Sequence, residues 1–265
     1  MIARGWLGLF VLSVRLGLGY LVRRRSYLRE AIVRIVVPMD PSRYLEFPET
    51  LRELAARPGE RVIDLASPKL VAVRLARQGI EVVSVDELAS EIETWRKLAG
   101  RTPGLTLQVA DGRALPFDDE SFDHAYSISV IEHIPGSGDA GALRELARVI
   151  RPGGRIVVTL PYADVYREDW RDNPLYVDHG GEDGRHFFGR WYDEAHVDAL
   201  RDAVAPVLDE RGRRLARLSP MAVNHAYERL FPLLVPLGWL FGFLVHEVDG
   251  PGGDMMRVTY VKRAP

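Results

Sequence analysis

The fold is decided by the stretch Leu107-Gln-Val-Ala-Asp-Gly-Arg-Ala-Leu-Pro-Phe-Asp-Asp-Glu-Ser-Phe-Asp-His-Ala-Tyr-Ser-Ile-Ser-Val-Ile-Glu-His-Ile-Pro135. Its first residues predict a strand that ends at Asp111, and an acidic loop follows. Residues 123–129 predict a second strand, which opens into a short helix carrying Glu132 and His133. A strand, an acid and a second strand in this order indicate an open α/β sheet.

Asp111 stands where a ligand contact is expected. In an open parallel sheet, ligands bind outside the carboxyl ends of the strands, so a carboxylate just after a strand points into the crevice. There it can accept a hydrogen bond from an exocyclic amine. The alternative is that Asp111-Gly112 is only a turn, because Asp-Gly is a common turn pair.

A complete βαβ unit precedes this stretch. Residues 61–66 predict a buried strand, and residues 69–78 have the apolar spacing of a helix that Gly79 ends. Residues 81–86 predict the next strand, which ends in Asp86. This acid lies about 20 residues after the first strand, where a ribose-binding carboxylate is expected.

The two blocks together resemble the class I S-adenosylmethionine-dependent methyltransferases of the small-molecule type. The resemblance is carried by the pattern D-x-x-x-L-P-F-x-D-x-S-F-D from Asp111 onward and by the Glu132-His133 pair after the next strand. It implies S-adenosyl-L-methionine as cofactor, with Asp86 on the ribose and Asp111 on the adenine amino group. The cofactor-binding residues that we predict are Asp64, Ala66, Ser67, Asp86, Asp111, Gly112 and Ser127.

The chain departs from the family in the glycine-rich loop after the first strand. Where the family has D-x-G-x-G-x-G, this chain has Asp64-Leu-Ala-Ser-Pro-Lys-Leu70, with Ala66, Pro68 and Leu70 in the glycine places. An alanine at a positive-φ site costs on the order of 1 kcal/mol, so the turn can still form. We expect Pro68 in the first turn of the following helix and Ser67 as its N-cap.

Farther along, the pattern predicts the second half of a seven-stranded, doubly wound Rossmann-like sheet. Residues 142–150 predict a helix that Arg151-Pro-Gly-Gly154 ends, and residues 155–160 predict a strand. Residues 214–218 and 256–261 predict the antiparallel last pair that the resemblance implies. The fold class is therefore α/β, with apolar N-terminal helices and an apolar insertion near the C-terminus.

The resemblance implies methyl transfer to an oxygen, nitrogen or carbon nucleophile of a small apolar molecule. We predict His133 as the catalytic base because it follows the fourth strand at the cleft; the alternative is a structural histidine. The Asn-Pro-Pro-Tyr signature of adenine or glutamine amide methylation is absent, since the matching strand end is Ser127-Ile-Ser129. A nicotinamide oxidoreductase would require G-x-G-x-x-G and Tyr-x-x-x-Lys, and neither occurs. The other hypothesis is a non-catalytic or repurposed methyltransferase fold.

Composition indicates a soluble enzyme domain. The chain has 265 residues, is 47% hydrophobic and has no cysteine, which excludes disulfides and thiolate zinc sites. A formal net charge of −2 argues against nucleic acid as a partner. We predict no metal site, because the spacing of His179, Asp183 and His186 matches no ligand pattern.

The N-terminal part is both basic and apolar. Residues 1–43 carry eight arginines against two acids, a net charge of +6, so the remainder carries −8. The apolar runs flank Arg15, whose burial in lipid would be costly, so a spanning helix is disfavoured. Two interpretations stay open: an interfacial helix on an anionic membrane, or a helix pair that caps the core and covers the active site.

These patterns predict an organisation with two additions to the core. We expect an apolar, basic helical segment over residues 1–50 and a methyltransferase-like domain over residues 51–265. The domain would include an acceptor loop at 162–191 and an apolar insertion at 222–250, whose residues 231–245 cover the cleft, pack on the N-terminal segment or enter lipid. The expected location is cytoplasmic, with peripheral contact to the inner membrane face through residues 1–25 and 231–245.

Overall fold

The computed structural model describes residues 3–23, 28–36, 39, 43–173, 181–182, 184–217, 246–248 and 252–264. The predictions for residues 231–245, and for most of the insertion at 222–250, lie outside the described residues. His179 and Asp183 also lie outside them.

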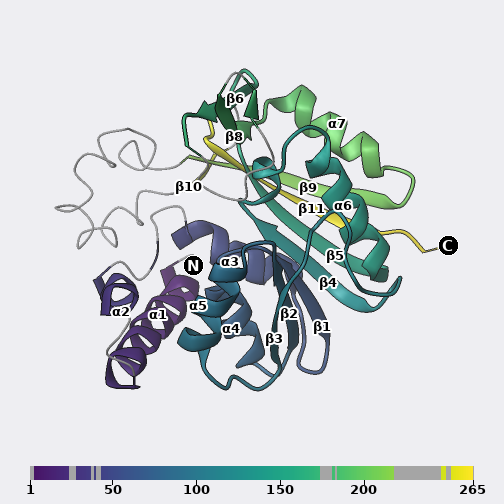
Figure 1. Ribbon diagram of the computed structural model, residues 1–265. Helices are drawn as coiled ribbons and strands as arrows, with labels where there is room; N and C mark the ends of the chain where they lie inside the picture. The colour runs from purple at the N-terminus through teal and green to yellow at the C-terminus, as the bar shows by residue number, and fades with distance from the viewer. Residues whose placement is uncertain are drawn as a thin grey trace.

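One large sheet forms the centre of the protein (Figure 1). Its strands are β1 (Arg61–Leu65), β2 (Glu81–Asp86), β3 (Leu105–Val109), β4 (Phe122–Ile128), β5 (Ile150–Pro161), β9 (Leu208–Arg217), β10 (His246–Val248) and β11 (Met255–Lys262). They lie in the order β10-β9-β11-β5-β4-β1-β2-β3. The five strands from β5 to β3 are parallel, and β11 is antiparallel to both β5 and β9. The predicted fold class is confirmed, with β10 as an eighth strand at one edge.

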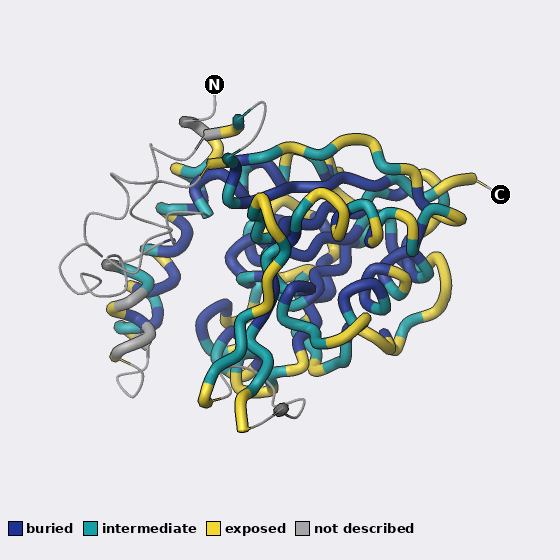
Figure 2. The backbone as a smooth tube through the Cα atoms, turned by 90° about the horizontal axis from the view of Figure 1, so that it is seen from above, coloured by how far each residue is buried: buried dark blue, intermediate teal, exposed yellow. Residues whose placement is uncertain are grey.

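Helices cover both faces of this sheet. They are α3 (Arg43–Leu54), α4 (Leu70–Ala76), α5 (Ala89–Ala99), the 3-10 turn η2 (Ile131–His133), α6 (Gly138–Val149) and α7 (Glu194–Val204). Helices α4 and α5 contribute to one cluster of buried apolar side chains, and α6 and α7 to another. Figure 2 shows the resulting buried interior. Strands β1 and β2 are buried along nearly their whole length, which explains their continuous apolar sequence.

Two further helices are α1 (Ala3–Arg23), which packs against α4 and α5, and α2 (Leu28–Val36), which packs against α1 (Figure 1). Helix α1 buries Leu9, Leu12, Leu16 and Tyr20 in the same cluster as α4 and α5. Its window Gly5–Val22 is long and apolar enough to cross a membrane, a test that core helices and signal sequences also pass. The helix pair predicted for the N-terminal segment therefore exists, and one side of α1 packs on the domain.

The predicted acceptor loop contains regular structure. Its strands β6 (Arg167–Arg171), β7 (Gly181–Glu182) and β8 (Arg185–Trp191) form a small antiparallel sheet in the order β6-β8-β7. The expectation of an open loop was therefore wrong for these residues. Trp170 of β6 pairs with Phe187 of β8, and aromatic cross-strand pairs of this kind stabilise a sheet.

Candidate functional site

The carboxyl ends of the parallel strands lie at one edge of the sheet, so the residues that follow β1, β2, β3 and β4 meet there. This brings Asp86, Asp111 and the Ser127–Ser129 segment to the same side. The sequence predicted this gathering. What the structure adds is the set of partners that each side chain has.

The turn after β1 keeps a glycine-like backbone although it has no glycine. Ala66 has a φ of +52°, and its N–H donates to the carbonyl of Val85 at 2.7 Å. That φ lies in the left-handed region, which costs an alanine on the order of 1 kcal/mol. The loop thus takes a backbone conformation that favours glycine although alanine stands there.

Ser67 does not cap α4, so this prediction was wrong. The helix begins at Leu70, and its N-cap residue is Lys69, which forms no side-chain cap bond. The Ser67 hydroxyl instead accepts a hydrogen bond from the N–H of Ile128 at 2.9 Å, so it ties the loop to the end of β4. Ser67 is almost completely buried, and its side chain is used within the protein.

Asp86 forms an ion pair that the sequence analysis missed. The Lys69 ammonium donates to Asp86 Oδ2 at 2.7 Å and to the Ser67 carbonyl at 2.9 Å. Asp86 Oδ1 accepts from the N–H of Leu88 at 3.0 Å. The Lys69 side chain is completely buried. The sequence signal that could have indicated this buried ion pair is the position of Lys69, a single lysine directly before the apolar helix α4.

Asp64 connects the loop to β2 through hydrogen bonds. Its carboxylate accepts from the Ser84 hydroxyl at 2.6 Å and from the N–H of Ser67 at 3.1 Å. Burial raises the pKa of Asp64, and the nearby charge of Lys69 opposes that shift. Ser127 is also fully buried, and its hydroxyl donates to the Leu65 carbonyl at 3.3 Å. Both side chains therefore hold the strand ends in place, and their predicted cofactor contacts stay predictions.

Asp111 is partly exposed and paired with Arg113. The Arg113 guanidinium donates to both carboxylate oxygens at 2.9 to 3.1 Å, and its backbone N–H donates to Oδ1 at 2.8 Å. A turn closes here with the N–H of Ala114 on the Asp111 carbonyl. Gly112 is needed for space, since a Cβ there would lie 2.6 Å from Leu65 Cδ1. The turn thus exists, and the carboxylate still reaches solvent at the strand end.

Helix α3 closes the ends of β4 and β5 with a polar network. Glu46 Oε1 accepts from the hydroxyls of Ser129 at 2.8 Å and Thr159 at 2.7 Å. Arg43 pairs with Glu46 and donates to the Ser129 hydroxyl at 2.9 Å. Ser129 has a φ of +50°, so the chain turns sharply as it leaves β4. The sequence analysis did not identify α3 as part of the site.

His133 faces β8, the long strand of the small sheet. Its Nδ1 lies 2.5 Å from the Phe188 carbonyl, which can only accept, so Nδ1 carries the proton. In a neutral ring Nε2 is then the nitrogen without hydrogen, and it lies 3.8 Å from Glu132 Oε1. Burial lowers the pKa of His133, which keeps the ring neutral at pH 7.

Glu132 is a buried carboxyl group with few polar partners. Burial raises its pKa to about 8. Among the described residues, no hydrogen-bond partner reaches Oε2 and no arginine or lysine lies within ion-pair distance. The group is therefore mostly protonated near pH 7. It forms, with His133, a neutral pair beside the crevice.

A buried arginine fixes the small sheet against this pair. Arg190 of β8 donates to the carbonyls of Ile134 at 2.7 Å and Gly136 at 2.8 Å, and it pairs with Asp139 at 3.0 Å. The Tyr192 hydroxyl donates to the same carboxylate at 2.9 Å. Since these bonds join β8 to the segment after η2, the small sheet is held next to His133.

The hydrogen-bond acceptors at the strand ends fit an adenosyl group. Carboxylate oxygens have two acceptor sites each, so Asp86 can accept from ribose hydroxyls beside its bonds to Lys69 and Leu88. Asp111 at the end of the neighbouring strand can accept from an amino group. Within the described ranges, no group of three His, Cys, Asp or Glu side chains could hold a metal ion.

Comparison with known proteins agrees with this geometry. Residues 64–158 match the family model described as a methyltransferase domain. Over 110 residues the chain is 43% identical to a demethylmenaquinone methyltransferase of Beutenbergia cavernae, which covers 41% of this chain and 44% of the relative. A relative of the same name from a Mycobacterium species is 40% identical over 116 residues, 42% of this chain and 45% of that protein. The match thus spans less than half the length of these relatives.

Solved structures share the fold at low sequence identity. A Haloferax volcanii methyltransferase solved with the activator Trm112 has a TM-score of 0.54 at 19% identity, covering 82% of this chain and 88% of that one. The glycopeptide N-methyltransferase MtfA, solved with sinefungin, has a TM-score of 0.53 at 16% identity, covering 83% and 86%. The resemblance to class I S-adenosylmethionine-dependent methyltransferases is confirmed by the family model and the relatives.

Proposed function

We propose that this chain, with its methyltransferase domain at residues 64–158, transfers a methyl group from S-adenosylmethionine to a small apolar acceptor. One observation carries the proposal: Asp86 and Asp111 end neighbouring parallel strands, and the neutral His133 follows β4 at the same edge. Acids at these two positions suit the ribose and the adenine of a nucleoside. The bound cofactor would supply an electrophilic methyl group on its sulfonium sulfur.

The residues of the chain have separable roles in this proposal. Asp86 would hold the ribose hydroxyls, and Lys69 would keep the Asp86 carboxylate oriented through their ion pair. Asp111 would accept from the adenine amino group, and Ala66 and Gly112 would allow close approach of the backbone. Much of the rate enhancement would come from positioning the acceptor in line with the methyl group.

His133 would act as the general base when the acceptor must lose a proton. Its Nδ1–H bond to the Phe188 carbonyl fixes the ring and leaves Nε2 as the proton acceptor. A lowered pKa keeps Nε2 unprotonated at neutral pH. General bases of this kind contribute about 10²- to 10⁴-fold to the rate.

The acceptor is proposed to be an apolar ring compound of the quinone class. This rests on the printed name of the relatives, demethylmenaquinone methyltransferase, and on the aromatic and apolar side chains of the small sheet. On β8, Phe187 and Phe188 make edge contacts with Trp170 and His133. The predicted cytoplasmic location stays a prediction.

The alternative function is a repurposed methyltransferase fold without methyl transfer. It is favoured by one observation: the Ser67 hydroxyl and the Lys69 ammonium are both bound internally, in the loop where Ala66, Pro68 and Leu70 replace the family's glycines. The cyclase SpnF shares this fold with a TM-score of 0.52 at 16% identity. A fold of this type does not by itself specify the reaction.

Calorimetric titration of the unmodified protein with S-adenosylmethionine, and with its demethylated product, separates the two proposals. We expect saturable binding of both, and transfer of labelled methyl to a demethylated naphthohydroquinone, the reduced form whose ring carbon is nucleophilic and loses a proton. Absence of binding heat, confirmed by an unchanged melting temperature with the ligand, would contradict the enzyme proposal. Binding without methyl transfer to any of a panel of apolar acceptors would favour the repurposed fold.

A further inference from the structure

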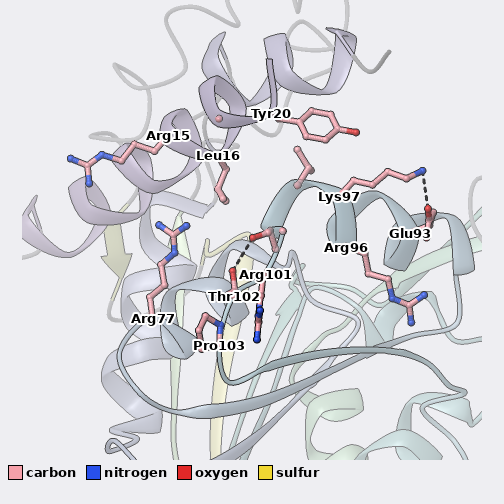
Figure 3. A pocket seen from close by; sticks show the side chains of 14 residues that line it. Arg15, Leu16, Tyr20, Arg77, Glu93, Arg96, Lys97, Arg101, Thr102 and Pro103 are labelled. Carbon is pink, nitrogen blue, oxygen red and sulfur yellow. Dashed lines mark hydrogen bonds and ion pairs between the residues drawn. The ribbon is translucent and has the colours of Figure 1, made fainter. Parts of the chain in front are cut away.

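A basic cavity lies between α1, α5 and the segment that leads to β3 (Figure 3). Its volume is about 520 Å³. Five of its lining residues are cations and one is an acid. The cations are Arg15, Arg77, Arg96, Lys97 and Arg101, and the acid is Glu93.

Little of this positive charge is neutralised inside the protein. Lys97 pairs with Glu93 at 2.8 Å, and Arg96 donates to the Leu107 carbonyl at 2.8 Å. Elsewhere in the described part of the chain, no carboxylate forms an ion pair with Arg15, Arg77 or Arg101. Their side chains are exposed, and Figure 3 shows them around the rim of the cavity.

An apolar stripe on α1 borders the same cavity. Leu7, Val11, Leu18 and Val22 are spaced by four, seven and four residues, so they lie on one face of the helix. Their side chains are 52%, 38%, 49% and 88% exposed. Arg15 lies on the helix between this stripe and the cavity. Leu28 and Ile32 of α2 are also exposed, so six of the nine exposed large apolar residues in the described chain belong to these two helices.

The cavity is separate from the candidate site at the carboxyl ends of the strands. Arg77 follows the C-terminus of α4, and Arg96 to Arg101 surround the C-terminus of α5. These helix ends lie at the amino-terminal edge of the parallel strands, opposite to Asp86 and Asp111. The partial negative charge of two helix ends favours cations there, but it does not account for the exposed apolar stripe beside them.

We propose that this face binds the surface of an anionic phospholipid membrane. The α1 stripe enters the apolar edge of the head-group layer, and the cavity cations receive lipid phosphates. Charge complementarity selects this occupant, because a purely apolar partner segment would leave the exposed arginines without a role. One side of α1 is packed on the domain, so the helix lies along the membrane rather than across it.

Vesicle sedimentation with the full chain tests this proposal. We expect retention by vesicles of phosphatidylcholine mixed with phosphatidylglycerol, weak retention by phosphatidylcholine alone, and loss of retention at high salt. The variant Arg77→Gln/Arg101→Gln should bind on the order of thirtyfold more weakly, at roughly fivefold for each cation. The matched control Arg144→Gln/Arg211→Gln removes the same charge from exposed sites on α6 and β9 and should bind like the unmodified protein.

A second variant examines the apolar half of the surface. Leu18→Gln/Val22→Gln should weaken retention by about tenfold or more while the salt dependence remains. All variants change exposed side chains, so melting temperatures should be unchanged.

Three results would overturn the proposal. One is that vesicles retain Arg77→Gln/Arg101→Gln as strongly as they retain the control Arg144→Gln/Arg211→Gln. Another is a stronger reduction of vesicle retention by inorganic phosphate than by chloride at equal ionic strength, which would indicate a site for free anions. The last is a dimer that Leu18→Gln/Val22→Gln dissolves, combined with no vesicle binding, since a second copy would then cover the stripe.

Discussion

The two halves of the candidate site differ in whether their acidic side chains form ion pairs. In the half formed by β2 and β3, the two acids at the strand ends each have a cation: Asp86 is paired with the buried Lys69, and Asp111 with Arg113. In the half formed by β4, η2 and β8, Glu132 has no lysine or arginine within ion-pair distance among the described residues, and its pKa is raised to about 8. One half therefore presents carboxylates that paired cations hold in place, and the other presents a neutral acid beside a neutral histidine.

This difference matches the division of labour that we propose. A nucleoside is held by fixed hydrogen-bond acceptors, which benefit from ionisation and orientation. An apolar acceptor is better received by uncharged groups, because burying an unpaired charge next to it is costly. Mutating the paired acids and the neutral Glu132–His133 pair separately tests whether the two halves have these different roles.

Asp86→Ala should have the largest effect. It leaves the Lys69 ammonium buried without its counter-charge, and breaking a buried pair in this way costs about 3–5 kcal/mol of unfolding free energy. Binding of S-adenosylmethionine should weaken by about tenfold or more, since unpaired polar groups cost roughly 1–3 kcal/mol. Urea denaturation and calorimetry measure the two effects.

The double variant Lys69→Met/Asp86→Ala provides the matched control. It removes both charges, so stability should recover largely while cofactor affinity stays low. Stability that remains low in the double variant would mean that Lys69 supports the loop through packing and not through its charge. Full affinity in Asp86→Ala would place the ribose elsewhere.

His133→Asn should lower kcat by about 100-fold with little change in stability. Asparagine can still donate to the Phe188 carbonyl, but it cannot take a proton. In the unmodified enzyme the base must be unprotonated, and burial lowers the pKa of His133. Activity should therefore fall on the acid side only below pH 6.5. An unchanged kcat in His133→Asn would leave the histidine a structural role.

Glu132→Gln should raise stability above neutral pH, by about 1–3 kcal/mol. The folded state holds this proton up to about pH 8, whereas the unfolded chain releases it near its usual value of 4.5. The folded state thus binds more protons between these limits, so stability declines as pH rises across that window. Glutamine cannot ionise, and the variant should lose this part of the pH dependence. Melting curves between pH 5 and about 9 measure it, and parallel pH profiles for both proteins would contradict the assignment.

The sequence predicted the central strands of the sheet and the acids at their ends, because both follow from local patterns. Buried strands are read from continuous apolar runs such as Glu81–Asp86, and the acid at each end is the residue where the run stops. The partners were not predictable in the same way. Lys69 reaches Asp86 across 17 residues, and Glu46 reaches Thr159 across 113, so they meet only after the sheet has formed.

The errors were also local. Serine is a common N-cap residue, but the Ser67 hydroxyl accepts a hydrogen bond from the N–H of Ile128 in β4. Such a tertiary contact cannot be predicted from the propensity of the residue. Residues 162–191 lack the long apolar runs of the main sheet, so their short strands were interpreted as an open loop. Their pairing depends on the anchor between Arg190 and Asp139.

Asp111→Asn should have the smallest effect, and it sharpens the comparison because this acid is the exposed member of the paired half. Its ion pair with Arg113 is at the surface, where such pairs contribute about 0–1 kcal/mol, so melting should hardly change. If Asp111 accepts from the adenine amino group, asparagine keeps a neutral acceptor about half as strong, and affinity should fall only a few-fold. Asp111→Ala should cost more, and Asp118→Ala, another acid of the same loop, should cost nothing. A marked drop in melting temperature with unchanged cofactor affinity would mean that Asp111-Gly112 serves only as a turn, and the adenine would then have to be held by other groups at this strand end.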